Sequence, residues 1–214
     1  MERHVVVRVD GTPVHLLGTI QGLASEASLV RDAAPRLAPR VVALGVGPED
    51  VRTLRTLADR SAAEDEFDTS AYEDQLLDRL RQFGDVRLPP PDLVEAVRVA
   101  DQRNVPLEAI DLDDAAYADL YTEEVGLLQL WSNNRRIRKA AALDLPTADA
   151  ATFILAWDRE FTRAKGYRRI EEVREESMAR RLRELARTKG EVFAIVPLAR
   201  LAGIQRRLSA SAHA

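Results

Sequence analysis

Three short runs of continuously apolar residues constrain the fold of this chain more than any other feature. They are VHLLGTI at residues 14–20, VVALGV at 41–46 and VFAIV at 192–196. Such short runs, without regular polar alternation, are typical of strands buried on both faces. With two further strands expected at residues 5–9 and 106–112, we predict an α/β fold with a mixed sheet of about five strands covered by helices.

Helical patterns fill the intervals between these strands. Asp10-Gly11 predicts a hairpin turn that Thr12-Pro13 would lengthen, and Ser25 is expected to cap the first helix. Asp113 is expected to cap another. The predicted helices are residues 26–37, 72–83, 92–103 and 198–208, with one more beginning at about residue 48.

Residues 114–189 are almost wholly helical in pattern and form a helical insertion and most of the C-terminal half. Breaks are expected near Ser132-Asn133-Asn134, residues 144–147 and Gly166, with the last long helix of this part at about residues 170–189. We predict that residues 1–214 form one domain. Residues 61–70 are expected to be a mobile loop, and the tail at 209–214 to be disordered.

The composition narrows the class of protein. Hydrophobic residues make up 46% of the 214 residues and charged residues 31%, which is typical of a globular protein. The net charge of −4 argues against bulk electrostatic binding to nucleic acid or acidic lipid. The basic run at residues 135–139 has no interleaved aromatic residues, so it is interpreted as a solvated helix face.

The absence of cysteine excludes disulfides, thiolate metal sites and a cysteine nucleophile, and it agrees with a cytoplasmic protein. The late apolar stretch is shorter than the ~20 residues that span a bilayer, and Arg200 interrupts it, so no membrane span is expected. Of the three histidines, only His15 lies near a plausible pocket, and a structural role is favoured for it. The glycines at 45 and 47 form no nucleotide-binding motif.

Ligands of open α/β sheets usually bind beyond the carboxyl ends of the strands. Helical spacing adds Arg174 to the candidate residues. Arg174 shares a helix face with Met178, Leu182 and Leu185, so it points toward the core. A buried arginine needs an acceptor. Arg174 is therefore either paired with Asp111 or part of a pocket, and the spacing favours the ion pair. The candidate pocket comprises Gly18, Gln21, Gly45, Asp111, Arg174 and Arg200.

Three blocks of sequence resemble the TraB/PrgY/GumN family, which is related to the Tiki proteins and more distantly to erythromycin esterase-like and ChaN-like domains. The blocks are VHLLGTIQGLASEASLVRDAAPRLAPRVVALGV, AVRVADQRNVPLEAIDLD and REESMARRLRELARTKGEVFAIVPLARLAGIQRRL. They resemble, in order, the family's strand-GTxH-helix opening, its strand ending in Ile-Asp, and its closing arginine, methionine, valine-rich strand, GxxH and Gly-Ile. The resemblance implies the fold predicted above.

The positions that carry function in the family are substituted. Gln21 and Arg200 stand where the two histidines are expected, Gly45 stands in place of a glutamate, and Leu112 replaces an arginine. The positions that match are Gly18, Asp111, Arg174, Met178 and Gly203-Ile204. The resemblance implies metal-dependent hydrolysis, with the histidines and the glutamate as ligands or acid/base groups, and this chain lacks all three.

Glutamine cannot transfer a proton, and arginine stays charged and offers no lone pair. We therefore expect a guanidinium in place of the metal's charge, in a cationic pocket suited to an anionic small molecule or peptide. The leading hypothesis is a catalytically inactive binding or regulatory module without a metal cofactor. One alternative is a divalent-metal-dependent hydrolase with a rewired site that uses Asp111, Arg174 and His15. The second is a structural or oligomerisation domain that forms a homo-oligomer.

Overall fold

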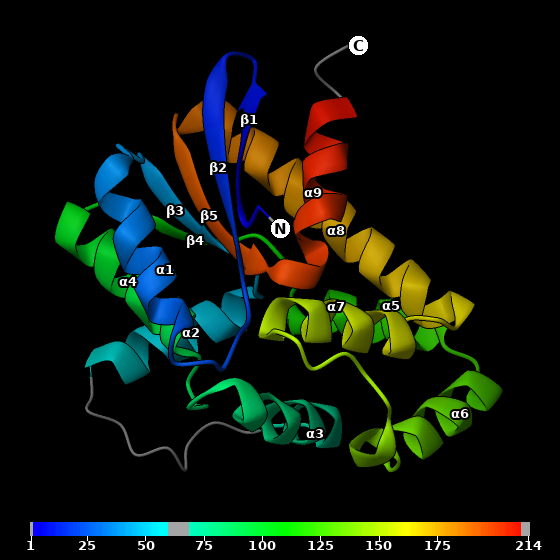
Figure 1. Ribbon diagram of the computed structural model, residues 1–214. Coiled ribbons are helices and arrows are strands. Elements are labelled where there is room, and N and C mark those ends of the chain that lie inside the picture. Colours follow the sequence, from blue (N-terminus) through cyan, green and yellow to red (C-terminus); the bar gives the residue numbers. More distant parts are fainter. Residues whose placement is uncertain (1, 60–68, 211–214) are drawn as a thin grey trace.

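A computed structural model describes residues 2–59 and 69–210 and has a five-stranded mixed sheet at its centre (Figure 1). The strand order is β1-β2-β5-β3-β4. Only β1 and β2 are antiparallel, and the other neighbouring pairs are parallel. The strands are β1 (His4–Val9), β2 (Thr12–Thr19), β3 (Val41–Leu44), β4 (Leu107–Ala109) and β5 (Val192–Pro197). The predicted α/β class and mixed sheet are confirmed.

Helices cover both faces of the sheet. On one face lie α1 (Glu26–Ala33), α2 (Pro48–Asp59) and α4 (Pro91–Arg103), and on the other lie α8 (Lys165–Thr188) and α9 (Leu198–Ala210) (Figure 1). Successive side chains of a strand point to opposite faces, which divides the core in two. Val41 and Ala43 pack with the α8 side, whereas Val42 and Leu44 pack with the α4 side. Burial on both faces explains why these strands are continuously apolar.

The helical portion predicted at about 114–189 is also present. It contains α5 (Asp114–Glu124), α6 (Leu127–Ile137), the 3-10 turn η4 (Ala140–Ala142), α7 (Ala150–Phe161) and most of α8. The predicted break at Ser132-Asn133-Asn134 is wrong, since α6 runs through it. Serine and asparagine are only mildly unfavourable inside a helix. The chain instead interrupts the helices at Val125 and Gly126.

The predicted break near Gly166 is present, between the end of α7 at Phe161 and the start of α8 at Lys165. Gly166 itself lies inside a helix. It belongs to the first turn of α8, which begins five residues earlier than predicted. A Cβ at this position would overlap the carbonyl oxygen of Glu124, so glycine allows α8 to approach the end of α5 closely.

Local differences elsewhere concern turns and caps. Asp10 and Gly11 both have positive φ, 49° and 84°, so the hairpin turn has two residues and Thr12-Pro13 does not lengthen it. Ser25 is in helical conformation and makes no side-chain cap, and α1 passes at Ala34 into the 3-10 turn η1 (Ala34–Arg36). Asp113 does cap α5, because its carboxylate accepts a hydrogen bond from the Ala116 N–H at 2.8 Å.

Two further predicted boundaries can be compared with the structure. The predicted helix at 72–83 corresponds to α3 (Ala71–Leu80) and the 3-10 turn η3 (Arg81–Phe83). The strand predicted at 106–112 is reduced to the three residues of β4. Most of the loop predicted to be mobile, and the last residues of the tail, lie outside the described residues. No helix in the described ranges is long and apolar enough to cross a bilayer.

Candidate functional site

Gly18 and Gly45 lie at the carboxyl ends of β2 and β3, and Arg200 lies three residues after the end of β5, in α9. Gly18 is the next-to-last residue of β2, and Gly45 directly follows β3. A Cβ on Gly18 would lie 2.8 Å from Cδ1 of Leu198, and a Cβ on Gly45 would lie 2.8 Å from Cδ of Pro197. Because these two glycines have no side chain, Pro197 and Leu198, where β5 ends and α9 begins, pack closely against β2 and the end of β3. That helix places Arg200 beneath this edge of the sheet, as the sequence predicted.

Arg174 and Asp111 form an ion pair beside this edge. The Arg174 Nε–H donates to Oδ2 of Asp111 at 3.0 Å, and Nη1 donates to the Glu171 carboxylate at 3.0 and 3.1 Å. Burial alone would lower the pKa of Arg174, but the charges of Glu171 and Asp111 outweigh it and raise that pKa. The ion pair favoured by the sequence is confirmed, and Arg174 remains a cation.

Arg200 is buried, with 6% of its surface exposed, and three carboxylates surround it. It pairs with Asp158 of α7, and lies 3.4 Å from both Glu171 and Glu175 of α8. Burial raises the pKa values of Asp158 and Glu175, and the charge of Arg200 offsets part of that rise. A buried guanidinium without such partners would be strongly unfavourable.

Shared carboxylates connect these pairs into one network. Glu171 contacts both Arg174 and Arg200, and Glu175 contacts both Arg200 and Arg207. The network thus extends from Asp111 at the end of β4 to Arg207 on α9. Each of its two predicted arginines is bound by at least two carboxylates of the protein itself. The positive charge expected at this place is therefore neutralised internally.

Gln21 lies in the turn after β2 and is partly buried. Its Nε2 has no hydrogen-bond partner among the described residues, and no hydrogen bond in that part of the chain joins Gln21 to Arg174 or Arg200. The structure therefore places Gln21 after the predicted strand but does not connect it to the charge network.

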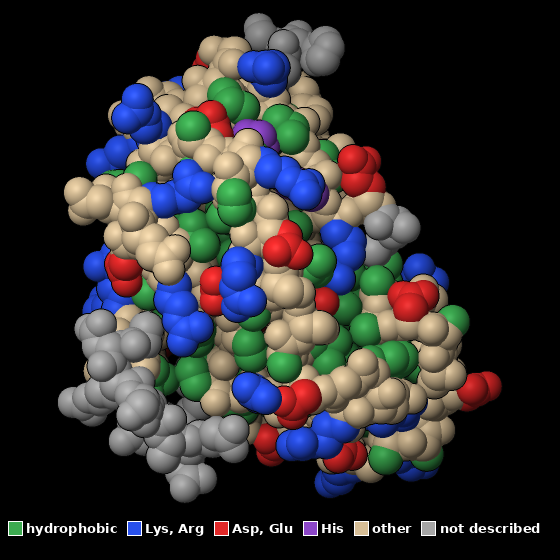
Figure 2. Space-filling view, turned by 60° about the vertical axis from the view of Figure 1, so that its left-hand side comes forward, with side chains coloured by type: hydrophobic (Ala, Val, Ile, Leu, Met, Phe, Trp, Pro, Cys, Tyr) green, Lys and Arg blue, Asp and Glu red, His purple; other side chains and the backbone are tan. Residues whose placement is uncertain are grey.

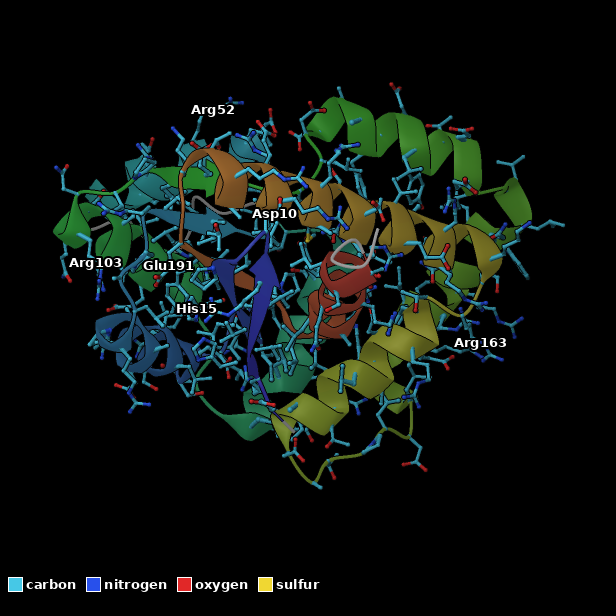
Figure 3. All side chains as sticks on the ribbon, turned by 90° about the horizontal axis from the view of Figure 1, so that it is seen from above. Asp10, His15, Arg52, Arg103, Arg163 and Glu191 are labelled. Carbon is cyan, nitrogen blue, oxygen red and sulfur yellow. The ribbon has the colours of Figure 1, made fainter. Side chains whose placement is uncertain are left out.

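His15 lies toward the other end of the sheet. His15 is paired in register with Phe193, near the start of β5, whereas Thr19 is paired with Pro197 at its end. Four residues of strand separate the two levels, or about 13 Å. His15 Nε2 lies 3.5 Å from a carboxylate oxygen of Glu191, and the two side chains are adjacent in Figure 3. Burial lowers the pKa of His15. The structure does not bring His15 to Asp111 and Arg174.

Sequence reasoning missed the carboxylates that complete the site. Glu171 and Glu175 belong to no motif, although Glu171 shares the helix face of Arg174. Asp158 carries no motif. Glu26 was also missed: its carboxylate is buried, accepts the Ile20 N–H at 2.9 Å and pairs with Arg3. The sequence signal for Glu26 was a charged residue shortly after the glycine turn that follows β2.

Asp92 is a further missed carboxylate. It is fully buried in the first turn of α4, and neither of its oxygens has a hydrogen-bond partner among the described residues. Burial raises the pKa of Asp92 to about 6, and the hydroxyl of Thr19 offsets only part of that rise. Thr19 ends β2, so this buried carboxylate lies close to the same edge of the sheet.

An open groove lies beside the network, along β4. Its volume is about 520 Å³. Its walls come from α2, from β4 with the residues after it, and from α8, and they include Arg52, Glu108, Asp111, Arg180, Arg181 and Glu184. Among the described residues, no three of the Asp, Glu and His side chains are grouped so that they could hold a metal ion.

Neither the models of known protein families nor the curated proteins that were compared with this sequence gave a match.

Proposed function

We propose that this chain is a divergent TraB-like domain that does not catalyse hydrolysis and acts as a binding or regulatory module. One observation carries the proposal: the guanidinium of Arg200 occupies the edge of the sheet and is held there by Asp158, Glu171 and Glu175. An arginine cannot coordinate a metal ion or accept a proton at any working pH. Gln21, at the other substituted position, cannot transfer a proton either.

The location of the ligand follows from how the arginines are paired. Arg174 and Arg200 are neutralised internally, so they are not free to bind an anion. Arg180, in contrast, lines the groove along β4 and contacts only the Ser177 hydroxyl, with no carboxylate within ion-pair distance among the described residues. We therefore assign the anionic ligand to this groove instead of to the internal network.

The free edge of β4 favours an extended peptide as that ligand. The carbonyl of Pro106 and the N–H of Ile110 bond to β3, so the backbone groups of even-numbered residues face β3. The backbone groups of Leu107 and Ala109 therefore face the groove. β4 is the last strand in the sheet order, and an extended segment can add to such an edge. Acidic side chains on that segment would reach Arg180.

The inactive site is tested by metal analysis and turnover measurements on the purified protein. We expect no stoichiometric divalent metal, no change of melting temperature with chelator, and no hydrolysis of a panel of esters and peptides with Zn²⁺ or Mn²⁺ added. Turnover that requires a divalent metal and is lost in Arg174→Ala would overturn the proposal. The matched control is Arg31→Ala, since Arg31 pairs with Glu95 away from this edge.

The peptide site is tested by calorimetric titration with a blocked hexapeptide of alternating valine and glutamate. We expect binding that weakens at least roughly tenfold in Arg180→Glu, because one charge-assisted contact becomes a repulsion. Arg55→Glu on the exposed side of α2 should leave the affinity unchanged. A peptide with prolines at alternate positions should not bind, since it cannot donate to the strand edge. Equal binding of the lysine analogue would rule out the assigned site.

A further inference from the structure

The helix α6 exposes three large apolar side chains. Leu127 and Leu128 are each 84% exposed and Trp131 is 61% exposed. They lie in the first two turns of α6, at the periphery of the molecule and away from the sheet (Figure 1). Single exposed apolar residues are ordinary, but a group of this size on one helix marks an interaction surface.

Exposed charges of opposite sign flank this apolar group along the chain. Asp114, Asp119 and Glu123 are exposed on α5, and Arg135, Arg138 and Lys139 are exposed on or just after α6. In the described part of the chain none of these six side chains forms an ion pair with a neighbour. Along the chain, the surface therefore passes from acidic through apolar to basic.

The packing of the two helices leaves this surface open. α5 is fixed against α8, where the hydroxyls of Tyr121 and Tyr167 lie 3.1 Å apart. α6 uses its other side, where Arg136 forms an ion pair with Glu160 of α7. No residue of α5 is buried, and Asn133 is the one fully buried residue of α6. The acidic and basic parts thus face outward instead of pairing with each other.

We infer that this surface, Asp114–Lys139, binds a second copy of the same chain in an antiparallel, two-fold arrangement. Two copies in that orientation place the acidic part of each against the basic part of the other, with Leu127, Leu128 and Trp131 at the axis. A two-fold interface requires such self-complementarity.

Other occupants fit this surface less well. An anionic membrane or a nucleic acid would attract Arg135 and Arg138 but would be repelled by the three exposed carboxylates of α5. A helix that binds in the groove of a partner protein carries apolar anchor residues as far as position i+7 or i+8. Here the corresponding positions after Leu127 and Leu128 are Asn134 and Arg135, which are polar.

The test is sedimentation equilibrium of the full chain over about 1–100 µM, where a dimer of ordinary affinity dissociates measurably. We expect Trp131→Ala to raise the dissociation constant roughly 30-fold or more, as for a central aromatic anchor. Asp119→Arg/Glu123→Arg and Arg135→Glu/Arg138→Glu should each be monomeric. Arg36→Glu/Arg55→Glu, on exposed positions of other elements, is the matched control and should dimerise normally.

Mixing the two reversed variants separates pairing from misfolding. In a homodimer of either variant, like charges face each other. In a heterodimer, the introduced arginines of one variant face the introduced glutamates of the other. We expect a heterodimer only in the mixture, with far-ultraviolet circular dichroism unchanged in each variant. A wild type that is monomeric at 100 µM, or a dimer that tolerates Trp131→Ala and both reversals, would overturn the inference, as would binding of the monomer to phosphatidylglycerol vesicles.

Discussion

Replacing the buried carboxylate of Asp92 should stabilise the protein at neutral pH and change how its stability depends on pH. Asp92 has no exposed surface, and its oxygens have no hydrogen-bond partner among the described residues. Burial raises its pKa from about 3.8 to about 6. Since one pKa unit corresponds to about 1.36 kcal/mol, the charged form costs the folded state on the order of 3 kcal/mol. Asp92→Asn keeps the shape and removes that charge.

The sign follows from proton binding. Well below the unfolded-state pKa of about 3.8, the Asp92 carboxyl is protonated in both the folded and the unfolded chain, so burial of the charge costs nothing. As the pH rises toward 6 the unfolded chain releases its proton first, and the folded state progressively loses stability. The difference in unfolding free energy between Asp92→Asn and wild type should therefore grow with pH. It should be near zero at pH 4 and roughly 3 kcal/mol at pH 7.5.

Urea denaturation followed by circular dichroism at several pH values measures this difference. Other groups also titrate, including His4 and His15, whose pKa values are lowered by burial and whose protonation destabilises the fold as the pH falls. Their contributions are common to both proteins and cancel in the difference. Asp101→Asn, at an exposed position of the same helix, is the control and should show no pH-dependent gain.

Two results would refute the reasoning. A difference that does not vary with pH would mean that Asp92 has an ordinary pKa in the folded protein. A less stable Asp92→Asn at pH 7.5 would mean that the partial positive charge at the start of α4 stabilises the carboxylate by more than burial costs.

Three further changes test the packing around the site. Arg200→Met should lower the unfolding free energy by roughly 3 kcal/mol in urea, because it leaves Asp158 without an ion-pair partner and removes one of the two partners of Glu171 and of Glu175. Gly203→Ala should lower the melting temperature, since the added Cβ would overlap the Glu175 carboxylate, and combining it with Glu175→Gln should cost less than the sum of the two. Ser70→Ala should cost about 1 kcal/mol by urea denaturation, because it removes the capping box formed with Glu73 at the start of α3.

The features that could be predicted from sequence are those set by local periodicity. Continuous apolar runs located the central strands, because β2, β3 and β5 are buried on both faces. Helical spacing turned Arg174 toward the core and left Asp111 as its nearest plausible acceptor, and the two side chains do pair. The breaks in the helical portion were less predictable, since serine and asparagine cost too little to interrupt α6.

The partners of Arg200 could not be predicted, because they come from α7 and α8 and are brought together only by tertiary packing. Glu175 shows the difficulty: it lies in a run of charged residues along one helix, which is an ordinary pattern for a solvent-exposed helix. The same residue is 7% exposed and contacts two arginines of α9. When a local pattern already explains a charged side chain, the contacts that it makes with residues far away in the sequence go unrecognised.

Charged side chains are arranged differently on the surface of the domain and around the buried Arg200. In the view of Figure 2, basic and acidic side chains alternate over the surface without forming one large patch of a single sign. Around Arg200, by contrast, the carboxylates are arranged about one guanidinium, and each of them loses a partner if it is removed. Under the proposed relationship to metal-binding domains, replacing Arg200 by histidine would therefore not restore a metal site. It would leave Asp158 without its ion-pair partner, whereas Glu171 would keep Arg174 and Glu175 would keep Arg207. Since no three Asp, Glu or His side chains of the described residues are grouped to hold a metal ion, several positions would have to change together.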